Sequence, residues 1–221
     1  MNKRLIVEKT AEHARKALTG EASGHDWWHT WRVSPLARRI ANEEGADTFV
    51  VELAALLHDI DDWKFSNDSD AGVRNARKFL EGLGVEEKAI AHVCRIIRDI
   101  PFKGARTKTK TKKTNPLSLE GKCVQDADRL DALGAIGIAR AFAYGGMKGR
   151  AIYEPGRRPM IHKTARSYLG AEGTTINHFH EKLLLLKGRM NTKAGKRLAS
   201  ERHAYMEQYL KRFLSEWAGK E

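Results

Sequence analysis

The run of residues 53–62, LAALLHDIDD, constrains the fold of this chain more than any other stretch. It begins with five apolar residues, which predict a helix face sunk into a core, and it continues at once into a histidine and three aspartates. Burying such groups without partners is costly, roughly 2–7 kcal/mol for one neutral polar group. A metal ion would remove that cost, because imidazole nitrogen and carboxylate oxygen are natural metal ligands. The sequence therefore predicts a metal site at the end of an apolar helix.

Two further polar clusters lie on either side of this run. Upstream, the segment 25–33, HDWWHTWRV, contains His29, and downstream the segment 126–131, DADRLD, is acidic. With a histidine, an adjacent His-Asp pair and a later aspartate in this order, the chain resembles the HD superfamily of metal-dependent phosphohydrolases. The resemblance implies one divalent ion (Mn, Fe, Co, Ni or Mg) held by His29, His58, Asp59 and Asp128. Such a ligand set leaves positions open for water and substrate, unlike a closed structural zinc site.

The choice of Asp128 among the three downstream aspartates combines helical geometry with the resemblance. On a helix, Asp126 and Asp128 are about 200° apart and so do not serve one ion together. Asp128 and Asp131 differ by about 60° and share a face. Family members carry the ligand in an Ala-Asp-x-Leu context, which residues 127–130 match. Asp131 is then expected just behind the ligands, and Asp126 is expected to pair with Arg129.

The residues that follow the His-Asp pair are expected to serve catalysis. A divalent ion lowers the pKa of a bound water and polarises a phosphoryl oxygen, so that the water can attack phosphorus. Asp62, four residues after His58, matches an acidic position that related phosphohydrolases use beside that water. Asp61 is the rival for this role, and capping of a helix end is the alternative for both. Lys64 and Arg32 are expected to bind phosphate, with surface salt bridges as the alternative.

Longer segments extend the resemblance to a bacterial branch of small HD-domain hydrolases that includes nucleotide pyrophosphohydrolases. These segments are 126–142, 144–146, 176–183 and 190–203, and members of the branch are similar over nearly the whole chain. The resemblance implies four substrate-binding residues, Arg140, Tyr144, His178 and Lys182. Salt bridging, packing or solvation is the alternative for each. His92 is the residue that can be argued for a second metal ion.

Apolar residues recur at helical spacing almost throughout, which predicts an all-α fold. Helices are expected at about 5–19, 27–44, 47–59, 68–83, 86–99, 117–144 (broken near Gly134 or Gly137), 175–190 and 192–217. Two irregular stretches, at about 101–116 and 145–173, are expected to be long loop insertions. The chain is thus expected to form a single HD-type helical bundle over residues 1–221. Its metal-binding core would lie at about 25–145, with C-terminal helices at about 174–217 packing on it.

Composition narrows the class of partner. The chain has 221 residues and a net charge of +12, which favours anionic partners such as phosphorylated metabolites. No segment approaches the length of a membrane span, and the N-terminus turns charged too early for a signal peptide, so a cytoplasmic protein without a membrane partner is expected. Cys94 and Cys123 lie in apolar helical patterns and are expected to be reduced core thiols.

The favoured function is hydrolysis of a nucleoside triphosphate to the monophosphate and pyrophosphate by attack of a metal-bound water. The same ligands would serve a phosphomonoesterase acting on nucleoside monophosphates or a cyclic-nucleotide phosphodiesterase, because pocket shape decides which phosphorus is presented. A different class, a basic helical nucleic-acid-binding module, is permitted by the charge, but no reader motif accompanies it. The sequence leaves open the metal, the base, the bond cleaved and the oligomeric state.

Overall fold

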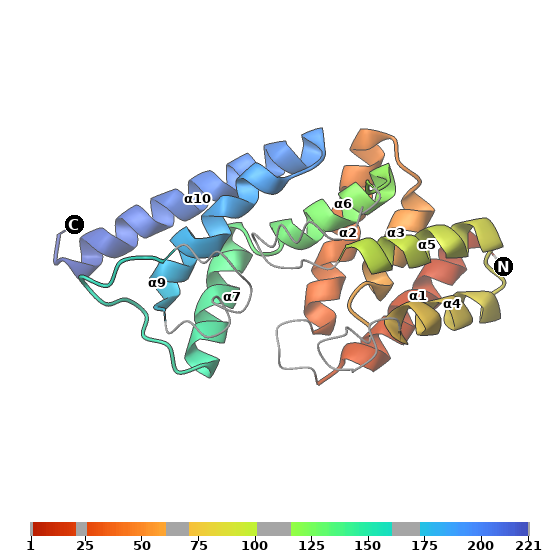
Figure 1. Cartoon of the computed structure of the whole chain (residues 1–221), viewed down its shortest axis with the longest axis horizontal. Helices are drawn as coiled ribbons and strands as arrows, with labels where there is room; N and C mark the ends of the chain where they lie inside the picture. The colour runs from red at the N-terminus through yellow and green to blue at the C-terminus, as the bar shows by residue number, and fades with distance from the viewer. Residues whose placement is uncertain (1, 21–25, 61–70, 101–115, 161–172, 221) are drawn as a thin grey trace. The chain divides into compact units, whose positions relative to one another are not determined.

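A computed structural model of the chain describes residues 2–20, 26–60, 71–100, 116–160 and 173–220. Within these ranges the ordered elements are helices and there is no strand, which confirms the predicted all-α fold (Figure 1). Among the same residues, no helix is both long enough and apolar enough to cross a membrane. The first expected loop, at 101–116, lies almost wholly outside the described residues, as does the part of the second at 161–172.

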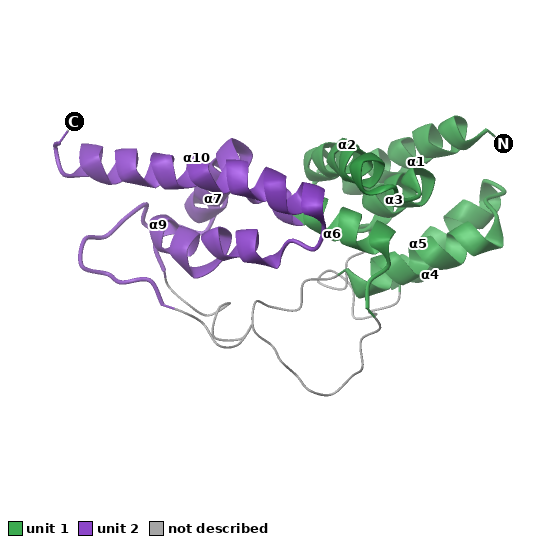
Figure 2. Cartoon of the chain, turned by 90° about the horizontal axis from the view of Figure 1, so that it is seen from above, with its two compact units in different colours: residues 1–101, 113–128 green, residues 102–112, 129–221 purple. Residues whose placement is uncertain are grey.

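The chain divides into two compact units (Figure 2). Unit 1 comprises residues 1–101 and 113–128, and unit 2 comprises residues 102–112 and 129–221. Each unit has its own buried apolar residues and is described by itself below. The expectation that the whole chain forms one domain stays a prediction.

Unit 1 is built around one apolar helix. Its elements are α1 (Lys3–Leu18), α2 (Trp27–Glu44), α3 (Thr48–Leu57), α4 (Ala71–Gly82), α5 (Glu87–Asp99) and the first ten residues of α6 (Leu119–Leu130). Helix α3 packs against α1, α2 and α5, and α4 packs against α5. Every residue from Leu53 to Leu57 is buried, because α3 is covered on several sides rather than along one stripe.

Capping residues explain where the two central helices of unit 1 begin. The Asp26 carboxylate accepts a hydrogen bond from the His29 N–H at 2.9 Å, and the Asp47 carboxylate accepts one from the Phe49 N–H at 3.0 Å. Helix α2 ends at Glu44, and the capping residue that follows, Gly45, has a φ of 73°, the left-handed conformation that glycine adopts without strain. The Asp26 cap fixes the start of α2 and therefore the position of the His29 backbone.

Unit 2 contains α7 (Gly134–Met147), α9 (Thr175–His178), a π-helical turn η1 (Phe179–Leu183), a 3-10 segment η2 (Leu184–Arg189) and α10 (Lys193–Trp217). Helix α10 packs against α7 and η2. Aromatic rings fill the space between them: the Phe142 centroid lies 5.9 Å from that of the fully buried Phe179 and 6.1 Å from that of Tyr209. The expected regular helix at 175–190 is instead three short helical types in succession.

The turn between α6 and α7 depends on glycine. Gly134 has a φ of 73°, and a Cβ at Gly137 would lie inside van der Waals contact of the Ala132 carbonyl. The backbone of the turn therefore lies directly against α7, which only an unsubstituted α-carbon allows. The predicted break near Gly134 is confirmed.

Candidate functional site

Two histidines and an aspartate of unit 1 converge. One ligand atom from each of His29, His58 and Asp59 lies within 4.8 Å of the other two. The Oδ2 of Asp59 is 3.4 Å from the Nε2 of both His29 and His58. The side chains of the three are only 1%, 3% and 9% exposed, respectively. The structure thus brings together three of the four predicted ligands.

The local fold places these groups. His29 lies in the first turn of α2, where the Asp26 cap holds its backbone. His58 and Asp59 directly follow Leu57, the last residue of α3, in a turn closed by the Ile60 N–H donating to the Leu57 carbonyl at 3.3 Å. The C-terminal end of a helix carries partial negative charge, which favours a cation beside it.

The protonation of His58 suits a metal ligand. Its Nδ1 lies 2.8 Å from the carbonyl oxygen of Ala55, and a carbonyl only accepts, so Nδ1 carries the proton. In the neutral ring Nε2 then has a lone pair, and it is buried without a hydrogen bond among the described residues. A metal-binding histidine commonly donates its other ring N–H to a carbonyl in this way. The residues present therefore fit a divalent ion.

Asp128 adjoins the same cluster from α6. Its Oδ1 is 3.4 Å from the Nε2 of His29, and its side chain is 28% exposed. Burial acts to raise the pKa of the Asp128 carboxyl, but the hydrogen bond and charge of His29 and the charge of His58 outweigh it, so that this pKa is lowered. An ionised carboxylate beside two imidazoles is the form that binds a cation.

The neighbouring aspartates differ in their surroundings. Asp126 is fully buried. Helix α6 ends at Leu130, so Asp131 lies outside it. The prediction that Asp128 and Asp131 share one helix face, about 60° apart, therefore does not apply. The Asp131 carboxylate instead binds the Arg140 guanidinium at 2.5 Å.

The remaining predicted residues of unit 1 are His92, Arg32 and three residues after the His-Asp pair. His92 shares a hydrogen bond of 2.8 Å with the Ser118 hydroxyl and lies 3.4 Å from Glu120, at the start of α6. Arg32 lies on α2 one turn after His29 and is half-buried. The predicted catalytic residues fall outside the described residues: Asp61, Asp62 and Lys64.

The other four predicted substrate-binding residues belong to unit 2. Arg140 and Tyr144 lie on α7, His178 ends α9, and Lys182 lies on η1. Burial first, and then the charges of Lys182 and Arg150, lower the pKa of His178 to about 3. The sequence analysis did not single out Arg150, because its segment looked like an irregular basic loop. The signal that could have found it is the glycine-rich basic run at 145–150, GGMKGR, directly after a helix.

Comparison with known proteins adds the following. Residues 27–133 match the HD domain family. YpgQ of Bacillus subtilis strain 168 is 42% identical over 205 residues, which span 93% of this chain and 90% of that protein. A solved structure of an HD-superfamily hydrolase from Bacillus thuringiensis is 43% identical, with a TM-score of 0.79 and coverage of 99% of this chain and 100% of the other. A crystal structure of B. subtilis YpgQ in complex with ADP is 38% identical, with a TM-score of 0.74 and coverage of 98% and 96%.

Proposed function

This chain belongs to the HD domain family and is an HD-superfamily hydrolase, and on that premise we propose that it cleaves nucleoside triphosphates to the monophosphate and pyrophosphate. The observation that carries the proposal is the convergence of His29, His58 and Asp59 on one buried point of unit 1. We include Asp128 as the fourth ligand of one divalent ion, because its Oδ1 lies 3.4 Å from His29.

The protein's contribution at this point is to hold four donors in a fixed arrangement. The Ala55 carbonyl fixes the ring orientation of His58, and the Asp26 cap fixes the backbone of His29. A divalent ion, when bound, supplies a Lewis acid that polarises a phosphoryl oxygen and lowers the pKa of a water ligand. The low exposure of the imidazoles keeps competing solvent from the ligand atoms.

Three features support a nucleotide as the substrate. The related YpgQ has been crystallised with ADP. The net charge of +12 favours an anionic partner. The proposed substrate-binding residues are polar or aromatic side chains suited to phosphate and base contacts: Arg32 in unit 1, and Arg140, Tyr144, His178 and Lys182 in unit 2. Asp62 or Asp61 is proposed to orient the attacking water, with Lys64 beside the phosphate.

Product analysis on a panel of nucleotides tests the proposal. Purified chain with added manganese is incubated with nucleoside triphosphates, monophosphates and cyclic nucleotides, and pyrophosphate and orthophosphate are scored separately. We expect pyrophosphate from triphosphates, no turnover by His58→Ala, and activity near the wild-type level in His92→Ala. His92 is the matched control because it is a histidine of the same unit bonded to Ser118 instead of the cluster. Orthophosphate from monophosphates, or opening of a cyclic nucleotide, would contradict the proposed bond.

A further inference from the structure

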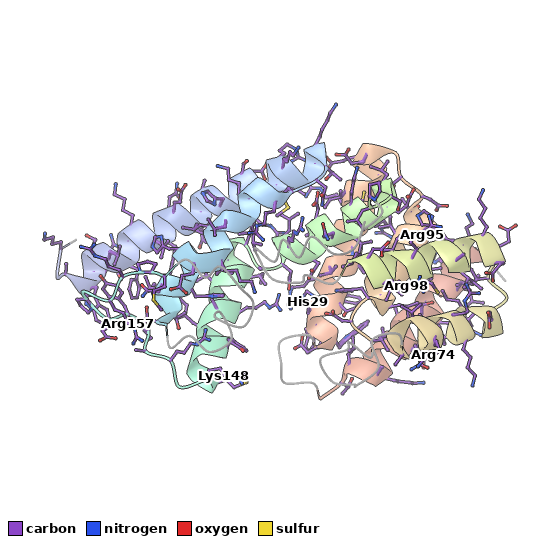
Figure 3. The ribbon with its side chains drawn as sticks, viewed as in Figure 1. His29, Arg74, Arg95, Arg98, Lys148 and Arg157 are labelled. Carbon is purple, nitrogen blue, oxygen red and sulfur yellow. The ribbon has the colours of Figure 1, made fainter. Side chains whose placement is uncertain are left out.

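Asp128 takes its position from the last turn of α6, which ends two residues later at Leu130. Its side chain is 28% exposed, and its Oδ1 lies 3.4 Å from the Nε2 of His29, which belongs to α2 (Figure 3). The last turn of a helix opens more readily than the middle, because its carbonyl groups lack partners within the helix. The position of the Asp128 carboxylate therefore depends on what holds this turn closed.

Arg202 of α10 binds the end of this turn. Its guanidinium donates a hydrogen bond to the carbonyl oxygen of Leu130, the last residue of α6. The same carbonyl accepts from the Leu133 N–H at 3.0 Å, so both of its lone pairs have a donor. A cation at the C-terminal end of a helix also interacts favourably with the helix dipole. Arg202 thus stabilises the turn that carries Asp128 through both a hydrogen bond and its charge.

The stem of Arg202 is itself held in place. A Cβ at Gly134 would lie 3.1 Å from the Cγ and 3.3 Å from the Cβ of Arg202, so the arginine stem lies directly over this glycine. Leu198 and Met206, four residues to either side of Arg202 on α10, are buried, which fixes the rotation of the helix about its axis. The half-buried Arg202 is therefore presented to α6 by a packed helix.

A second arginine holds the same turn. The guanidinium of Arg129, the residue after Asp128, donates to the carbonyl of Arg189 at the end of η2. The two residues that follow Asp128 are thus bound by contacts with segments that lie far away in the sequence.

We propose that Arg202 is a positioning residue of the metal site, which holds the last turn of α6 closed and thereby fixes the Asp128 carboxylate. The proposal rests on the proposed function in one respect, namely that Asp128 is a metal ligand. The role of Arg202 would parallel that of the Asp26 cap at His29 and of the Ala55 carbonyl at His58. Residues that orient metal ligands commonly contribute about 10–100-fold to metal affinity.

Calorimetric titration of the full chain with manganese measures this role without a nucleotide. Arg202→Met keeps an unbranched stem over Gly134 and removes the charge and the donors. We expect it to weaken manganese binding about tenfold, with a wild-type circular dichroism spectrum. Arg202→Lys, which retains a cation and a donor, should recover part of the affinity. Arg197→Met is the matched control and should stay within about twofold of the wild type, because Arg197 pairs with Glu201 of its own helix at 3.3 Å.

A double-mutant cycle separates positioning of Asp128 from a general effect on the fold. In Asp128→Asn the proposed ligand is already impaired, so adding Arg202→Met should change the manganese affinity by less than about twofold. The visible absorption of bound cobalt gives a second readout, since it depends on the ligand geometry. The cobalt spectrum of Arg202→Met should shift toward that of Asp128→Asn, and the spectrum of Arg197→Met should match the wild type.

Wild-type affinity in Arg202→Met, or the same tenfold loss when it is added to Asp128→Asn, would overturn the positioning role. Should Arg202→Met not fold, Arg202→Gln carries the same expectation, and failure of both to fold would make Arg202 a residue of fold stability instead. The proposed hydrolysis is decided separately. A wild type that binds manganese but cleaves no nucleotide leaves the role of Arg202 standing, whereas a wild type that binds no divalent ion refutes both proposals.

Discussion

Protonation of His178 should make the protein less stable as the pH is lowered, and the substitution His178→Asn should remove this effect. In the folded chain burial, Lys182 and Arg150 lower the pKa of His178 to about 3, from the usual 6.5. The unfolded chain therefore takes up a proton below about pH 6.5 that the folded chain refuses until about pH 3. Between these values acid favours the unfolded state. At about pH 5 the linkage costs about 2 kcal/mol of the free energy of unfolding, and near pH 7.5 almost nothing.

Urea denaturation of the wild type and of His178→Asn at several pH values measures this linkage. Asparagine keeps a hydrogen-bonding side chain and does not titrate. The difference in free energy of unfolding between the two proteins should shift by about 2 kcal/mol in favour of the variant between about pH 7.5 and about pH 5. His180→Asn, at an exposed neighbour on η1, should track the wild type. Parallel pH curves for the wild type and His178→Asn would refute the reasoning.

Three other predictions concern stability and reactivity. Gly137→Ala should destabilise the chain by about 3 kcal/mol in urea unfolding, because its Cβ would press on the Ala132 carbonyl; an unchanged midpoint would contradict that contact. Arg140→Gln should lower the free energy of unfolding by about 3 kcal/mol, because the buried Asp131 carboxylate loses this cation. Adding Asp131→Asn should recover part of the loss. If the effects of the two substitutions simply add, the pair is not coupled. Cys123, whose pKa burial raises to about 12, should resist alkylation near pH 8 in native protein and react in denaturant; rapid native labelling would place it at the surface.

Local signals in the sequence predicted much of unit 1. Apolar periodicity and the caps Asp26 and Asp47 located α2 and α3 closely, because a side-chain cap and the helix it starts are neighbours in sequence. The His-Asp pair directly follows the apolar run, so its place at the end of α3 could be predicted. The Ala55 carbonyl that orients His58 was not predicted, since a backbone acceptor leaves no mark in residue type.

Unit 2 was harder to predict because its features depend on contacts between distant segments. The double glycine at 145–146 suggested a helix end near Tyr144, yet α7 continues to Met147 and uses Gly145 to approach Thr175. The π-helical turn at 179–183 differs from an α-helix by a hydrogen-bond register that apolar spacing does not encode. The pairing of Asp131 with Arg140 required knowing that α6 stops at Leu130.

Metal content tests the central claim most directly. Wild-type chain, Asp59→Asn and His92→Ala are loaded with manganese, dialysed together and analysed by mass spectrometry for bound metal. The account predicts one ion per chain in the wild type and in His92→Ala, and loss of the ion from Asp59→Asn, whose carboxylate lies 3.4 Å from both imidazoles. Equal metal in all three proteins, or none in the wild type with any of several divalent ions, would contradict it.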